Sequence, residues 1–173
     1  EDLRRPVRAV LRHNRSECLQ RGVEAARVRV FGGSLAKKDV GGLLHALRAG
    51  EPVVTYVDQD FRYRHAFVPF FGIPAATLLR TPELVREAGA RMLPFWLHRE
   101  PDGSYVLRIE DAWPGWIDGT PEASAAIYMR ALETAVRAHP EQYLWVHRRV
   151  KTRPPGEPSL YAWGGARPSG WGL

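Results

Sequence analysis

The segment from Val53 to Thr77 constrains the fold of this chain more than any other. It opens with the apolar run VVTYV (53–57), whose β-branched and aromatic residues predict a buried strand. Two carboxylates, Asp58 and Asp60, follow at once. Because charged side chains are rarely buried without a partner, acids at the end of a buried strand indicate the edge of a site.

Basic and then strongly apolar residues follow these acids. Arg62, Arg64 and His65 come first, and the run FVPFFGIP (67–74) comes next. That run has too much proline for a central strand and too many apolar residues for a solvated loop. Together, the acidic strand end, the basic turn and the apolar run favour a site for an amphiphilic anionic ligand. The alternative is structural: the acids pair with nearby arginines, and the phenylalanines cover the core.

Composition narrows the classes of partner. The chain has 173 residues, enough for one domain with its own core. Lys and Arg number 25 against 19 Asp and Glu, which favours nucleic acid, phospholipid surfaces or an acidic carrier protein. We do not expect nucleic acid, because the aromatics cluster with proline and leucine rather than alternating with basic side chains. The single Cys18 and the scattered histidines show no metal-ligand spacing, so neither a metal nor a cofactor is expected.

Periodicity predicts an alternation of helices and strands. The N-terminal part is expected to hold a helix over 6–21 and a short alternating strand over 27–31. Asp39 is expected to cap a helix that begins at Val40 and ends near Gly50. A helix followed closely by a strand is typical of an α/β sheet.

Turn and cap signals predict the remaining elements. Thr81 is expected to cap a helix that ends at Gly89, and the sequence PDGS (101–104) predicts a hairpin turn. The other expected elements are strands over 91–98 and 105–109, and a long helix that is capped by Thr120 and ends near Ala138.

Several segments, taken in order, resemble a known family. They are Lys38-Asp39, Asp58-Gln59-Asp60, FVPFFG (67–72) with AAT (75–77), PDG (101–103), and PEQYLW (140–145) followed by HRR (147–149) and KTRP (151–154). Their order and spacing resemble the bacterial lipid A biosynthesis acyltransferases, the lauroyl and myristoyl transferases that add secondary acyl chains to lipid A. The resemblance runs from roughly Val28 to Tyr161.

The resemblance implies a fold, a reaction and a location. The fold would be that of the glycerolipid acyltransferases, an α/β fold with a central mixed sheet flanked by helices. The reaction would move a fatty acyl chain from acyl carrier protein (or acyl-CoA) to a hydroxyl of a lipid A precursor. Residues 1–161 would form the C-terminal part of one acyltransferase domain, followed by an irregular tail over 162–173. This part would lie peripherally on the cytoplasmic face of the inner membrane of Gram-negative bacteria, with the membrane anchor expected upstream.

The sequence departs from the family at its catalytic motif. The family uses His-x4-Asp or His-x4-Glu, in which the histidine is the general base and the carboxylate fixes its tautomer. None of the six histidines here has an acid five positions later. The chain is therefore expected to be a fragment without a catalytic residue of its own, inactive in isolation. The alternative is a catalytically inactive remnant that binds lipid or acyl carrier protein.

Other family residues can be carried over by position. Arg29, ten residues before Asp39, and the acids Asp58 and Asp60 are expected to support catalysis, with Arg29 stabilising phosphate or oxyanion charge and Asp60 orienting it. A purely structural Arg29–Asp60 pair is the alternative. Arg62 stands where the family usually has glycine, so the sequence does not decide the conformation of the local turn. The expected substrate-binding residues are Phe67, Phe70, Phe71, Arg62, Arg64, His147, Arg148 and Arg149, although the last three could instead form a structural helix-end cluster.

Overall fold

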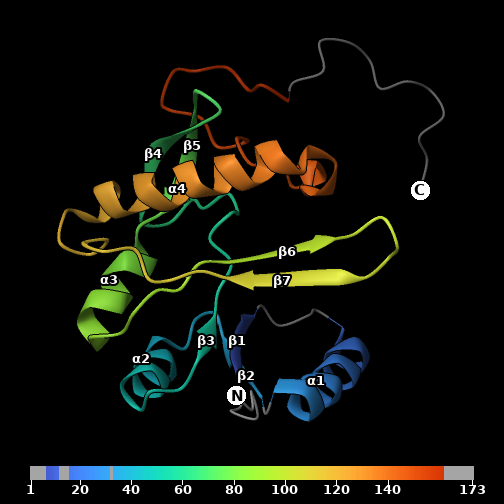
Figure 1. Cartoon of the computed structure of the whole chain (residues 1–173). Coiled ribbons are helices and arrows are strands. Elements are labelled where there is room, and N and C mark those ends of the chain that lie inside the picture. The colour runs from blue at the N-terminus through green and yellow to red at the C-terminus, as the bar shows by residue number, and fades with distance from the viewer. Residues whose placement is uncertain (1–6, 12–15, 32, 162–173) are drawn as a thin grey trace.

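The computed structural model describes residues 7–11, 16–31 and 33–161 (Figure 1). Its N-terminal part is a small parallel sheet with strand order β2-β1-β3. The strands are β1 (Arg8–Leu11), β2 (Ser34–Ala36) and β3 (Val53–Val54). Both pairings are parallel, so each strand must be joined to the next by a crossover.

Two helices make these crossovers. α1 (Glu17–Phe31) joins β1 to β2, and α2 (Val40–Arg48) joins β2 to β3. The carboxylate of Asp39 accepts a hydrogen bond from the Gly42 N–H at 2.9 Å, which caps α2 as the sequence predicted. Figure 1 shows α1 and α2 at the lower end of the molecule beside the parallel strands.

The predictions for the first 31 residues were wrong in two places. Arg8–Leu11, expected inside a helix over 6–21, is the central strand of the parallel sheet. Residues 27–31, expected as a strand, form the last turns of α1. The physical reason is tertiary: strands on both sides of β1 hold it extended, and a short alternating pattern does not outweigh a helix already under way. Pro6, the expected helix start, lies outside the described residues.

The proline-rich apolar run folds into an antiparallel hairpin. Its strands are β4 (His65–Phe70) and β5 (Ile73–Leu78), with Pro69 opposite Pro74. A two-stranded sheet tolerates both prolines because each strand is an edge. Phe71 and Gly72 form the turn, both with positive φ (51° and 76°), as a tight two-residue hairpin turn requires.

The main core lies between this hairpin and the longest helix, α4 (Pro121–Ala138). α4 crosses β4–β5 in Figure 1 and buries Met129 and Tyr128 against Val68 and Phe70. The Tyr128 hydroxyl donates to the Leu78 carbonyl at 2.8 Å, so the helix is also tied to β5 by a hydrogen bond. α4 begins as predicted, with the Thr120 hydroxyl accepting from the Ala123 N–H at 3.2 Å.

A second hairpin lies between this core and the parallel sheet in Figure 1. Its strands are β6 (Phe95–Arg99) and β7 (Tyr105–Ile109). Gln142 reaches β6 from η1 (Pro140–Gln142), where its side chain accepts from the Arg99 N–H at 2.8 Å and donates to the Arg99 carbonyl at 3.0 Å. η2 (Trp145–His147) follows η1.

Three other element boundaries differ from prediction. α3 (Arg80–Ala88) has Leu79 at its N-cap with no side-chain cap, and Thr81, the expected cap, is buried inside the helix. The strand expected over 53–57 is only two residues long, and β6 begins after Pro94. The α/β class is confirmed, with parallel and antiparallel strands divided among three small sheets in the described part of the chain. None of the helices described is long and apolar enough to cross a membrane.

Candidate functional site

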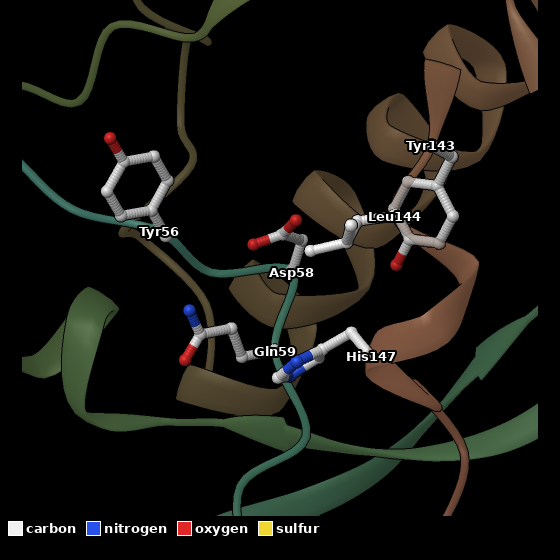
Figure 2. A pocket seen from close by; sticks show the side chains of 6 residues that line it. All are labelled: Tyr56, Asp58, Gln59, Tyr143, Leu144 and His147. Atoms are coloured by element: carbon white, nitrogen blue, oxygen red, sulfur yellow. The ribbon is translucent and has the colours of Figure 1, made fainter. Parts of the chain in front are cut away.

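A cavity of about 310 Å³ lies where the acidic segment meets the two short 3-10 turns (Figure 2). Asp58 and Gln59 form one wall, on the linker between β3 and β4, and His147 reaches toward them from η2. The remaining lining residues are Tyr56, Tyr143 and Leu144. The cavity therefore joins two segments more than 80 positions apart in the sequence.

Hydrogen bonds on the C-terminal side of Asp58 and Gln59 hold the linker between β3 and β4 in place. The buried Phe61 donates its N–H to the Ala76 carbonyl at 3.3 Å, which fixes the linker to the outer edge of β5. Asp60 accepts hydrogen bonds from the Thr152 N–H and hydroxyl at 3.1 and 2.9 Å, and Lys151 Nζ lies 4.0 Å away. These anchors leave Asp58 and Gln59 free to face the cavity.

The two acids therefore have different surroundings. The Asp60 side chain is 1% exposed and fully engaged by Thr152 and Lys151. The half-buried Asp58 forms no hydrogen bond or ion pair with any described residue. A carboxylate that is partly withdrawn from water without a partner retains its capacity to accept hydrogen bonds. The structure thus makes Asp60 a fixed support and Asp58 an available group.

Two groups on the opposite wall complement Asp58. Burial, reinforced by the negative charge of Asp58, raises the pKa of Tyr143 to about 12, so its hydroxyl stays protonated and can donate. Nε2 of His147 is buried and has no hydrogen-bond partner among the residues described. Buried polar atoms are normally paired, so an unpaired one in a cavity wall indicates a ligand or water position.

Arg149, two positions after His147, is buried, with 3% of its surface exposed. It donates to the Ala76 carbonyl at 2.9 Å and to the Thr77 hydroxyl at 2.7 Å. Burial lowers the pKa of Arg149, while Tyr143, Tyr128, Asp60 and Asp58 act in the opposite direction. Its positive charge thus offsets the acids from inside the protein rather than from the cavity surface.

The expected HRR cluster is therefore divided among three environments. His147 lines the cavity, and Arg149 is buried against β5. Arg148 is exposed and ends η2 in the left-handed conformation (φ 55°). Its guanidinium carbon lies 5.8 Å from the centroid of the Tyr161 ring. Of the three, only His147 can touch a ligand in the cavity.

The phenylalanines of the apolar run also separate. Phe70 is buried in the main core. Phe71 occupies the hairpin turn, where its N–H donates to Glu133 at 2.7 Å and the Arg137 guanidinium lies 4.6 Å from its ring. Phe67 is half-buried beside the His65 ring. The structure therefore supports the core interpretation for Phe70 and leaves Phe67 and Phe71 partly accessible.

The remaining predicted residues lie outside the cavity. Arg64, at φ 44°, pairs with Glu83 at 2.7 Å, and Arg62 is exposed. Arg29 is exposed in the last turn of α1 and forms no ion pair with a described residue. The Arg29–Asp60 pair, the structural alternative, is therefore not formed, and the Asp60 oxygens accept from Thr152 instead.

Four cavity residues were not predicted from the sequence as site residues. They are Tyr56, Gln59, Tyr143 and Leu144. Tyr56 lies two positions before Asp58 and Gln59 directly after it, and Tyr143 and Leu144 lie inside the PEQYLW segment that carries the family resemblance. The signal was present in that motif, but its role as one wall of a cavity depends on a tertiary contact.

Comparison with known proteins now places the chain. A family model described as bacterial lipid A biosynthesis acyltransferase matches residues 2–152, which include both walls of the cavity. The chain belongs to this family.

Several curated lipid A acyltransferases are similar to the chain. It is 38% identical over 160 residues to a lipid A biosynthesis palmitoleoyltransferase of Escherichia coli (strain K12), covering 90% of this chain and 52% of that protein. It is 39% identical over 140 residues to a lipid A biosynthesis lauroyltransferase of the same organism, covering 78% of this chain and 45% of that protein. The chain spans about half the length of the curated relatives it matches.

Proposed function

We propose that this lipid A acyltransferase family member takes part in moving a fatty acyl chain from acyl carrier protein, or acyl-CoA, to a hydroxyl of a lipid A precursor. The observation that carries the proposal is the family match over residues 2–152. Relatives with 38 and 39% identity are named for transfer of palmitoleoyl and lauroyl groups in lipid A biosynthesis.

Residues 1–173 are proposed to supply supporting and binding groups rather than the general base. None of the six histidines is followed by an acid at the family's spacing. Asp60, rigidly held by Thr152, is suited to orient a charged or hydroxyl group beside the cavity. The exposed Arg29 guanidinium is free to stabilise phosphate or oxyanion charge on a substrate, as the family resemblance implies.

The edge of the cavity is also suited to a membrane surface. Leu144, Trp145 and Val146 are 64, 52 and 82% exposed in one continuous stretch. Tryptophan favours the interface between water and lipid, and exposed apolar residues in a cluster indicate a contact surface. We therefore propose peripheral contact with the cytoplasmic face of the inner membrane through this stretch, with Phe71, 6.3 Å from Trp145 between ring centroids, beside it.

A chimera tests the proposal. The part of the E. coli lauroyltransferase that aligns with this chain would be replaced by the present sequence, and lipid A would be analysed by mass spectrometry in cells that lack the native enzyme. We expect the chimera to restore acylation. A chimera that accumulates stably at the membrane but transfers no acyl group would contradict the proposal.

Two substitutions in that chimera test whether Asp60 supports catalysis or only stabilises the fold. Asp60→Asn is expected to lower acylation on the order of tenfold, because it removes the charge that orients its partners. Thr152→Val is the matched control, since it removes a hydrogen bond to Asp60 and keeps the carboxylate. Equal losses in both variants would assign Asp60 a purely structural role.

A further inference from the structure

The cavity contains an unusual combination of unpaired polar groups. Asp58 offers two acceptor oxygens that no described residue uses, and Nε2 of His147 has no partner among the described residues. The Tyr143 hydroxyl, kept protonated by its raised pKa, supplies a donor on the same wall as His147. A ligand that satisfies these groups must therefore accept and donate within one small space.

Charge excludes two ligand classes. A phosphate would meet the Asp58 carboxylate, and among the described residues no lysine or arginine lines the cavity to attract it. A cation would meet the field of the buried Arg149, whose charge already offsets Asp58 and Asp60. A cation would also leave the Tyr143 hydroxyl donor without an acceptor. The balance favours a neutral ligand.

Shape and lining exclude an acyl chain and favour a compact ring. The volume of about 310 Å³ is at the small end for ligand pockets. Within the described part of the chain, Leu144 is the only aliphatic side chain in the lining. Burying Asp58, Gln59 and His147 under an acyl chain would leave their polar atoms unsatisfied. Tyr56 and Tyr143 add aromatic faces, on which the C–H groups of a saturated ring can pack.

We propose that this cavity binds a neutral, hydroxyl-bearing sugar ring, with Asp58 accepting hydrogen bonds from ring hydroxyls while Tyr143 and His147 donate to their oxygens. This inference rests on the proposed function, in which the ring would belong to the acceptor substrate. It assigns the sugar, rather than the phosphate or the acyl chains, to the space between the two walls.

Titration of the 173-residue chain with N-acetylglucosamine, followed by two-dimensional amide NMR, tests the inference. We expect saturable chemical-shift changes concentrated at Asp58, Gln59, Tyr143 and His147. Asp58→Asn keeps the shape of the side chain but removes its charge, and should weaken binding at least about tenfold, since hydrogen bonds to an ionised group are roughly twice as strong. Asp111→Asn, an exposed carboxylate outside the cavity, should bind as the parent does.

Parallel titrations use three other probes: glucosamine, which carries an ammonium, inorganic phosphate and decanoate. Tighter binding of any of them at the cavity residues would overturn the inference, as would equal affinity of the parent and Asp58→Asn chains for N-acetylglucosamine. The proposed function is separable. Specific sugar binding combined with an inactive chimera would contradict acyl transfer alone, whereas an active chimera whose KM for the acceptor is unchanged by Asp58→Asn would contradict the sugar site alone.

Discussion

The molecule contains two antiparallel hairpins, and they differ in what covers them. β4–β5 places Val68, Phe70 and Ala75 under α4, in the main core. β6–β7 pairs Phe95 with Ile109 and Leu97 with Leu107, so these four apolar side chains share one face. On that face Leu97, Leu107 and Ile109 are 59, 54 and 56% exposed. Similar alternating sequences thus form a core in one hairpin and an open surface in the other.

The strand edges differ in the same way. The outer edge of β5 is sealed by arginines from the C-terminal segment: Arg149 donates to the Ala76 carbonyl and Arg153 to the Pro74 carbonyl, both at 2.9 Å. β7 pairs only with β6 among the described strands. Unpaired strand edges are sites where other chains can add. A hairpin therefore becomes a stable core element only when other segments satisfy both its face and its edge.

The largest predicted effect is loss of packing under α4. Met129→Ala should lower the free energy of unfolding by about 2–5 kcal/mol, because Met129 is fully buried between α4 and the hairpin. Leu107→Ala, on the open face of β6–β7, should change it by less than about 0.5 kcal/mol. Urea denaturation of both variants measures the difference. Similar losses would mean that the β6–β7 face is covered in solution.

Removing an arginine that bonds the outer edge of β5 should lower the free energy of unfolding somewhat less. Arg149→Met is expected to destabilise by about 1–3 kcal/mol, because the Thr77 hydroxyl oxygen loses its buried donor and the Ala76 carbonyl keeps only the Phe61 N–H. Arg148→Met, at the exposed neighbour, serves as the control and should stay within about 0.5 kcal/mol. Hydrogen exchange provides a second test, since the amides of β5 should lose protection in Arg149→Met and not in Arg148→Met.

The same contrast explains what the sequence could predict. Local signals located α2, α4 and the β6–β7 hairpin, because the Asp39 and Thr120 caps and the PDGS turn act within a few residues. They failed at Arg8–Leu11, whose extended form depends on β2 and β3. They also did not identify FVPFFGIP as a hairpin, because a Phe-Gly turn with both φ values positive is not a usual turn sequence.

The candidate site shows the same limit. Asp58 and His147 were singled out separately from the sequence, and both line the cavity. Their meeting could not be derived, because it depends on the Thr152–Asp60 hydrogen bonds that join the C-terminal segment to the linker. The sequence likewise treated Arg148 and Arg149 alike, whereas η2 turns one outward and the other into the protein. Motif order identified the family, and tertiary contacts decided which motif residues reach the cavity.

The partly buried Tyr143 should make the stability of the fold depend on pH in the alkaline range. The pKa of Tyr143 is raised to about 12 by burial, so below pH 10, the ordinary phenol value, it is protonated in both the folded and unfolded chains. Between about pH 10 and 12 only the unfolded chain ionises, and stability is lost as pH rises. Tyr143→Phe should remove about 1 kcal/mol of this loss, a value reduced for the partial exposure of the ring. Unfolding of the parent chain and of Tyr143→Phe, monitored at each pH, measures the difference.

The smallest expected effect on stability lies on the open face of β6–β7. Replacing Leu97 and Leu107 together by Thr introduces β-branched residues, which favour strands, and removes two exposed apolar side chains that lie directly opposite each other. The free energy of unfolding should change by less than about 0.5 kcal/mol, because the folded chain does not bury these groups. Self-association, measured by sedimentation velocity over a concentration series, should fall, because an exposed apolar face beside an unpaired edge promotes chain–chain contact.

The matched control is Val68→Thr on the covered hairpin, which should destabilise the protein because it buries a hydroxyl in the main core. A double variant that unfolds as readily as Val68→Thr would show that the two hairpins are covered alike, and the contrast between them would have to be abandoned.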